Sequence, residues 1–137
     1  MAVGPSLRQL HAHKAIHNGG MAGAVSKTDQ VLECLENGDT ELANALADDL
    51  LQYWENRIIG HADAEEEGFY REIVKGNASM QETITKLSRD HDLLRIIVAD
   101  IHQLRQSEGL SSEVLHKLQS LIVVNEIHSR DEERLLF

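Results

Sequence analysis

The chain has 137 residues with one cysteine; 42% of the residues are hydrophobic, 26% are charged, and the formal net charge is −10. This composition predicts a single folded domain over residues 1–137, and it excludes a disordered chain, a disulfide framework and a cysteine-based zinc site. The acidic balance disfavours nucleic acid and anionic membrane surfaces as partners, and the absence of a membrane-spanning apolar run or a secretory signal predicts a cytoplasmic protein.

Helical periodicity runs through almost the whole sequence, and Pro5 is the only proline. A chain without later prolines can be helical nearly throughout. Asn37–Gly38 and Gly76–Asn77 predict breaks, and Asp39 or Thr40 is the expected cap of the helix that follows the first break. The expected helices span about residues 6–36, 40–75, 79–106 and 113–137. Four long helices with short connections predict an all-α, up-down-up-down antiparallel four-helix bundle.

Two of these helices carry the same His-x-x-x-Glu spacing. It occurs as His61 and Glu65 in the second helix, and as His128 and Glu132 in the fourth. Residues four apart in an α-helix lie about 40° apart in angle and about 6 Å apart along the axis, so each imidazole shares a face with its carboxylate. Both pairs continue the apolar face of their helix. A carboxylate there must be paired or metal-bound, because an isolated buried charge is costly.

The other two helices offer histidines at the same height. In an antiparallel hairpin, residues equally far from the turn lie level with each other. The predicted turns therefore place His91 level with both His61 and His128. On the first helix the matching height falls between His13 and His17, and the position on the apolar face slightly favours His17. We expect all four helices to contribute to one centre.

The converging residue types favour a pair of metal ions. Two carboxylates can bridge two first-row metals about 3.5–4 Å apart, with imidazoles binding at both ends. Nitrogen and oxygen ligands without sulfur favour iron or manganese, and zinc is an alternative. The candidate ligands are His13, His17, His61, Glu65, His91, His128 and Glu132.

Acidic residues beside these candidates fall into two groups. Glu66 and Glu133 directly follow the candidate carboxylates, and they are expected to face solvent because they lie about 100° further round the helix. Asp90 and Asp131 flank candidate histidines. Either could accept a hydrogen bond from an imidazole N–H and so orient that ring.

The order His … His-x-x-x-Glu … His … His-x-x-x-Glu, one block per helix, resembles the hemerythrin-like (HHE cation-binding) family over nearly the whole chain. The resemblance implies a non-haem di-iron centre, oxo- or hydroxo-bridged, that binds O2 and, in bacterial relatives, NO or peroxide. His91 alone on the third helix is similar to the bacterial and repair-type branch rather than to the invertebrate oxygen carriers. The implied bridging ligands are Glu65 and Glu132, and the implied terminal ligands are His61, His91, His128 and His17 or His13.

The predicted function is binding or sensing of O2, NO or peroxide, or the handling of iron itself. The first alternative is a di-iron oxidase or peroxide-decomposing enzyme, which needs a phenol or thiol at the open coordination position; the sequence offers no strong candidate. The second alternative is a helical interaction or regulatory domain that binds zinc or no metal. A ferritin-like centre is disfavoured, because its Glu-x-x-His spacing is absent at His61 and His91.

Overall fold

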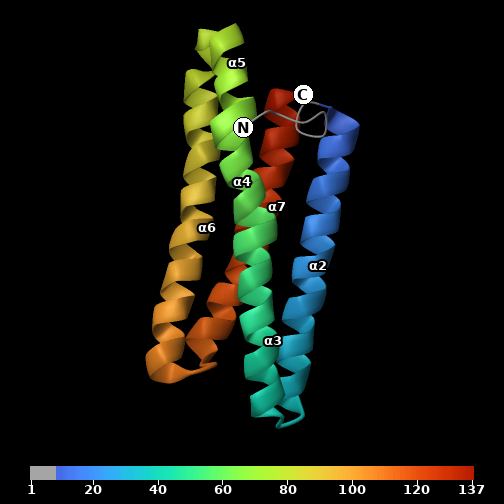
Figure 1. The fold of residues 1–137 in the computed structure, drawn as a ribbon, viewed down its shortest axis with the longest axis vertical. Coiled ribbons are helices and arrows are strands. Elements are labelled where there is room, and N and C mark those ends of the chain that lie inside the picture. The colour runs from blue at the N-terminus through green and yellow to red at the C-terminus, as the bar shows by residue number, and fades with distance from the viewer. Residues whose placement is uncertain (1–8) are drawn as a thin grey trace.

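The computed structural model describes residues 9–137, which form four long helical rods and contain no strand. Consecutive rods run in opposite directions (Figure 1), so the predicted all-α, up-down-up-down bundle is confirmed. Three rods are single α-helices: α2 (Leu10–Glu36), α6 (Gln81–Glu108) and α7 (Ser112–Leu136). The second rod is continuous but composite, with α3 (Thr40–Tyr53), η1 (Trp54–Ile59), α4 (Gly60–Ala64), η2 (Glu65–Phe69) and α5 (Tyr70–Gly76), followed by the 3-10 turn η3 (Ala78–Met80).

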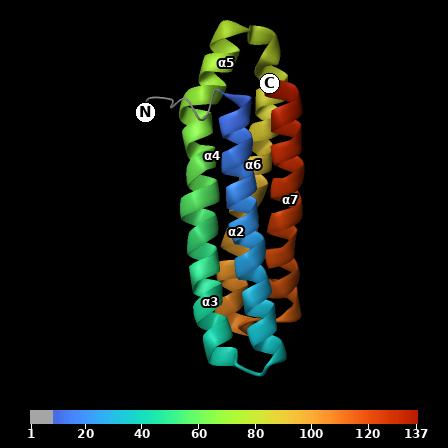
Figure 2. The same cartoon turned by 90° about the vertical axis from the view of Figure 1, so that its right-hand side faces the viewer.

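The four rods surround a common interior. The first rod packs against α3 and α7, and α6 packs against α7 and the second rod. The hairpin of α5 and α6 extends beyond the level at which α2 begins and α7 ends (Figures 1 and 2). No helix within residues 9–137 combines the length and apolar character needed to cross a bilayer.

The helix ends follow the local sequence signals. Asp39 accepts a hydrogen bond from the Leu42 amide at 3.1 Å, and Gly38 has a φ of 77°, which favours glycine. Ser111 caps α7 by accepting from the Val114 amide at 3.3 Å. The expected start of the first helix near residue 6 lies outside the described residues. Within them, α2 begins at Leu10.

Two apolar clusters stabilise the bundle at different heights. The larger cluster consists of Ala24, Val31, Ala47, Leu50, Leu51, Trp54, Leu94, Val98, Ile101, Val114, Leu118 and Leu121. The smaller cluster consists of Phe69, Tyr70, Ile84 and Leu87, with Leu136 packed against it. Burial of each large apolar side chain contributes about 1.5–3 kcal/mol. Along the rods, the buried side chains of Glu65, His91, His128 and Glu132 lie between the two clusters.

The glycine-rich stretch of α2 makes room for a neighbouring aromatic side chain. The Tyr53 hydroxyl donates to the Gly20 carbonyl at 2.9 Å, and it lies so close to Gly23 that a Cβ there would overlap it. This contact packs α2 closely against α3, next to the level of the buried polar and charged side chains.

Candidate metal centre

The structure brings all seven predicted ligand residues together inside the bundle. They form two groups whose ligand atoms lie within 4.8 Å of one another. The first group contains His13, His17, His61 and Glu65, and the second contains Glu65, His91, His128 and Glu132. Glu65 belongs to both groups, so a single carboxylate connects the two halves of the centre.

The first half lies between α2 and α4. The His13 Nε2 atom is 3.3 Å from Glu65 Oε2 and also contacts Glu132 Oε1, while His17 Nε2 is 3.2 Å from Glu132 Oε1. The His61 Nε2 atom is 3.7 Å from Glu65 Oε1. His13 is fully buried, whereas the His17 side chain is 9% exposed. The sequence slightly favoured His17, but the structure places both histidines in the centre, one helical turn apart.

The second half lies between α6 and α7. His91 Nε2 is 3.0 Å from His128 Nε2 and 3.4 Å from Glu65 Oε1, and His128 Nε2 is 3.2 Å from Glu132 Oε2. Both imidazoles are almost completely buried. The predicted equal height of His61, His91 and His128 is therefore confirmed by direct contact through the shared carboxylates.

The pKa values of the two histidines in this half are shifted in opposite directions. Burial and the neighbouring His128 lower the pKa of His91 to about 3. Burial also opposes charge on His128, but hydrogen bonds to Asp90 and Glu132 raise its pKa to about 9. The protonated His128 thus faces a neutral His91 at 3.0 Å. A cation held by His91 and His128 would require both imidazoles to be neutral, so its binding would release that proton.

The two shared carboxylates differ in charge for a similar reason. Burial and the neighbouring Glu132 raise the pKa of Glu65 well above its usual range. Burial also disfavours ionised Glu132, but hydrogen bonds from His128 and His13 hold its pKa well below its usual range. One carboxylate is protonated and one is ionised, because two adjacent buried anions would repel each other. Bound cations would allow both to ionise.

Carboxylates outside the centre hold the outward nitrogens of several ligands. Asp90 Oδ2 is 2.9 Å from His128 Nδ1, as predicted for one of the two candidate aspartates. Glu66 Oε2 is 3.0 Å from His91 Nδ1 and is itself bound by Arg95, so the prediction that Glu66 faces solvent was wrong. These contacts fix each ring with Nδ1–H donating outward and Nε2 facing inward.

The two remaining acidic residues, Glu133 and Asp131, differ in whether they contact a ligand histidine. Glu133 Oε1 is 3.3 Å from His17 Nδ1, although it was expected to face solvent. Asp131 accepts a hydrogen bond from Arg134 at 3.4 Å, and no contact with a ligand histidine is present in the described part of the chain. A helix face 100° from the ligands is still within reach of a neighbouring rod in a four-helix bundle.

One functional group in the centre was missed by sequence reasoning. Tyr70 is 1% exposed, donates its hydroxyl hydrogen to Glu132 Oε2, and stacks on His91 with ring centroids 5.6 Å apart. Burial and the nearby Glu65 and Glu132 carboxylates raise the pKa of Tyr70, so the phenol keeps its proton.

Local backbone geometry explains why Tyr70 was missed. In a regular α-helix, position 70 lies five residues and about 140° round from Glu65, facing away from the centre. The π segment η2 (Glu65–Phe69) has wider turns with i→i+5 bonding, which return Tyr70 to the face of Glu65. Periodicity at 3.6 residues per turn contains no signal for this insertion.

The residues fit a metal centre on grounds internal to the structure. His61 Nε2, His13 Nδ1 and Glu65 Oε2 are buried without a hydrogen-bond partner among the described residues. Unpaired buried polar atoms each cost about 1–3 kcal/mol. His61 Nε2 and Glu65 Oε2 belong to the groups above and face their interior. Burial and the nearby His17 lower the pKa of His61 to about 4, so its imidazole is neutral and free to bind a cation.

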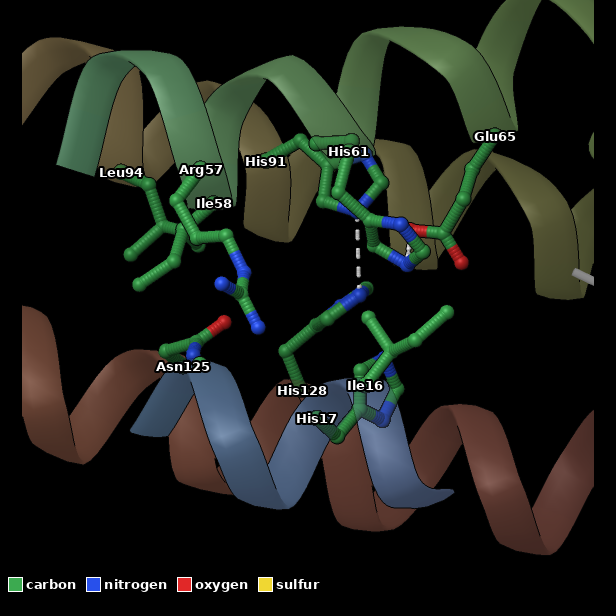
Figure 3. Close-up of a pocket in the computed structure, with 12 residues that line it drawn as sticks. Ile16, His17, Arg57, Ile58, His61, Glu65, His91, Leu94, Asn125 and His128 are labelled. Atoms are coloured by element: carbon green, nitrogen blue, oxygen red, sulfur yellow. Dashed lines mark hydrogen bonds and ion pairs between the residues drawn. The ribbon is translucent and has the colours of Figure 1, made fainter. Parts of the chain in front are cut away.

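A pocket opens beside the centre, on the side away from Tyr70. Figure 3 shows the ligand histidines His17, His61 and His128 at one side of this pocket and the Arg57 and Asn125 side chains at the other. Small molecules could therefore reach the ligand residues from this direction.

Comparison with known proteins agrees with this geometry. The family model described as Hemerythrin HHE cation binding domain matches residues 23–137. The match includes His61, Glu65 and the ligands on α6 and α7, but it begins after His13 and His17, whose place in the centre is therefore supported by the structure alone. No curated protein and no solved structure gave a significant match.

Proposed function

The chain belongs to the hemerythrin HHE cation-binding domain family, and on that premise we propose that it is a non-haem di-iron protein that binds or senses O2, NO or peroxide. A metal-binding hemerythrin-like protein is what the family and the two histidine and carboxylate groups support directly. The choice of iron, the small ligand and a cytoplasmic location are our proposals.

A single observation carries the proposal of two metals: the two ligand groups share Glu65, and Glu132 contacts histidines of both. Two carboxylates between two sets of imidazoles match the ligand supply of a binuclear centre better than that of two separate ions. Nitrogen and oxygen donors without sulfur suit iron or manganese, with zinc as an alternative, and among these the family resemblance favours iron. A pair of iron ions would supply reversible redox chemistry and affinity for small ligands.

The protein's own residues define what such a centre can do. The five histidines turn Nε2 toward the two carboxylates and would hold the cations, while Glu65 and Glu132 would compensate their charge. The apolar cluster around Phe69 and Leu87 excludes water from one side. Access is left to the pocket on the other side, which selects ligands of small size.

The first experiment measures metal content in protein from iron-fed cells, together with absorption spectra before and after dithionite and air. We expect about two irons per chain and a reversible near-ultraviolet band. Removing the metal with a chelator should lower the melting temperature by roughly 10 °C or more, because a tightly bound ligand stabilises only the folded state. Zinc or no metal after iron loading would contradict the proposal.

Tyr70 favours a second candidate function, a di-iron oxidase or peroxide-decomposing enzyme. Such an enzyme needs a phenol or thiol at the open coordination position, and Tyr70 brings a phenol into contact with Glu132, one of the candidate ligands. The test compares peroxide consumption by the iron-loaded protein with that of Tyr70→Phe. A loss of tenfold or more with unchanged iron content supports the enzyme, and equal consumption by Tyr53→Phe and wild type provides the control. Equal consumption by Tyr70→Phe and wild type would show that the phenol takes no part, and no consumption by either protein supports binding or sensing instead.

A further inference from the structure

One arginine joins α6 to the second rod beside the metal centre. Arg95 lies one turn after His91 on α6. One of its terminal nitrogens donates to Glu66 Oε2 at 2.5 Å and to Asp63 Oδ1 at 2.6 Å, both on the second rod. The other donates to Asp92 Oδ1 at 2.9 Å, three residues back on α6 itself. Three carboxylates from two rods therefore meet on a single guanidinium.

One of these carboxylates also holds a candidate ligand. Glu66 Oε2 lies 3.0 Å from His91 Nδ1, so the same oxygen accepts from the guanidinium and from the imidazole. The opposite nitrogen of this ring, His91 Nε2, lies 3.0 Å from His128 Nε2 inside the centre (Figure 3). A continuous chain of contacts thus leads from Arg95 through Glu66 to the centre.

The local geometry of the second rod alone would not keep Glu66 in this position. Adjacent residues of a helix point about 100° apart, so Glu66 points away from the centre that Glu65 enters. The Glu66 side chain is 29% exposed and could turn to solvent. Within residues 9–137, it forms ion pairs with Arg95 and His91 alone. The arginine therefore supplies the charged contact that keeps Glu66 against α6.

The same arginine holds an irregular part of the second rod. Asp63 belongs to α4, whereas Glu66 lies inside the π segment η2, and Arg95 binds both. The wider turns of η2 bring Tyr70 onto the ring of His91, with centroids 5.6 Å apart. Such π insertions are rare in α-helices and are frequent at functional sites. Arg95 therefore fastens η2 to α6 where two residues of η2 and α5 contact one ligand histidine.

We propose that Arg95 is a positioning residue of the metal centre, which acts through Glu66 to hold the His91 imidazole in the orientation that binds metal. The inference rests on the proposed function, because its effect is exerted on a ligand of the metals. Carboxylates that orient ligand histidines contribute about 10–100-fold to metal affinity. Arg95 acts one contact further from the metals, so its effect should be smaller than that of Glu66.

A second arginine of α6 offers a matched comparison. Arg105 donates to Asp48 Oδ1 at 2.6 Å and to Asn44 Oδ1 at 3.1 Å, so it also joins α6 to the second rod. Both partners lie on α3, and within residues 9–137 neither contacts a candidate ligand. Exposed ion pairs contribute about 0–1 kcal/mol to folding. Replacing either arginine should therefore change stability little, and only replacement of Arg95 should weaken metal binding.

The test measures anaerobic Fe²⁺ binding by the full chain in competition with a colorimetric chelator. We expect Arg95→Gln to weaken Fe²⁺ binding about threefold to tenfold. Arg95→Lys should recover part of this loss, because lysine keeps the charge and loses the fork. Arg105→Gln should bind Fe²⁺ as wild type does. Circular dichroism and urea unfolding check the fold of each variant, and Arg95→Lys provides the comparison if Arg95→Gln does not fold.

A double variant separates positioning through Glu66 from a general loss of packing or charge. Glu66→Gln alone should weaken Fe²⁺ binding about tenfold, because His91 loses its carboxylate partner. Adding Arg95→Gln to this variant should weaken binding no further, since the contact through which Arg95 acts is already absent. Independent effects of the two residues would multiply instead.

The outcomes distinguish this inference from the proposed function. Two Fe²⁺ ions per chain with unchanged affinity in Arg95→Gln would overturn the positioning role and leave the metal centre standing. Equal losses in Arg95→Gln and Arg105→Gln would also overturn it, as would multiplied losses in the double variant. A wild-type chain that binds no Fe²⁺ would overturn both the positioning role and the proposed function.

Discussion

The two halves of the centre contain similar ligands but differ in how the protein supports them. In the half between α6 and α7, the Nδ1 atoms of His91 and His128 lie 3.0 and 2.9 Å from the carboxylates of Glu66 and Asp90. In the half between α2 and α4, the Nδ1 atom of His17 lies further from its carboxylate, at 3.3 Å from Glu133 Oε1, and the Nδ1 atom of His13 and the Nε2 atom of His61 have no hydrogen-bond partner among residues 9–137.

Exposure differs at His17 and His61 but not at His13, which is fully buried; the His17 side chain is 9% exposed. The side chains of His91 and His128 are 2% and 3% exposed, whereas that of His61 is 18% exposed. Hydrogen-bonded carboxylates fix the tautomer and orientation of a ligand histidine and increase its affinity for metal. We therefore expect the α6/α7 half to hold its metal more tightly and the α2/α4 half to adjust more easily when a ligand enters.

The largest effect on metal content is expected when Glu65, the residue that the two halves share, is removed. Glu65→Ala should reduce metal content from about two ions per chain to nearly none, because both groups lose an anionic ligand at once. Elemental analysis of purified protein measures this, and circular dichroism checks that the helices remain. Glu67→Ala changes an exposed carboxylate of the same rod and should retain two metals. Full metal content in Glu65→Ala would show that the halves are independent.

Variants of single histidines test directly whether the two halves hold metal with different strength. His61→Ala and His91→Ala should each keep about one metal per chain. A chelator should remove the metal remaining in His61→Ala roughly 10–100 times more slowly than the metal remaining in His91→Ala. The ion that remains in His61→Ala lies in the half supported by Asp90 and Glu66. Equal rates of removal would contradict the proposed difference between the halves.

The outer carboxylates can be tested without touching a ligand. Asp90→Asn should lower metal affinity about tenfold, because the carboxamide cannot support the His128 imidazole as a carboxylate does. Asp131→Asn is the matched control: it has the same change of side chain three residues after His128 and should alter affinity less than twofold. Competition with a metallochromic dye gives both affinities. Similar losses in the two variants would assign the effect to net charge.

The smallest effect on the centre is expected from the apolar packing below it. Gly23→Ala should destabilise the fold by about 1–3 kcal/mol, because its Cβ would overlap the Tyr53 hydroxyl. Metal content should stay near two per chain. Gly76→Ala meets no atom within 4 Å and should leave the unfolding free energy almost unchanged. Metal loss in Gly23→Ala, measured on folded protein, would show that the packing of α2 on α3 also positions His13 and His17.

The sequence by itself determined the rods, their turns and the height of the centre. Apolar periodicity depends on the helix repeat alone, and the glycine and capping signals at Gly38 and Asp39 act over a few residues. Counting from the predicted turns was enough to place His61, His91 and His128 level with each other. Such features follow from local geometry, which a regular helix repeats faithfully.

Only the tertiary structure decided what surrounds the ligands. The π segment η2 brings Tyr70 to Glu132, and this insertion leaves no mark in an α-helical periodicity. Glu66 was assigned to solvent because its own helix turns it away from the ligands, yet α6 brings His91 and Arg95 to meet it. Contacts between rods depend on their rotation and spacing, and these are set by the packing of all four helices together.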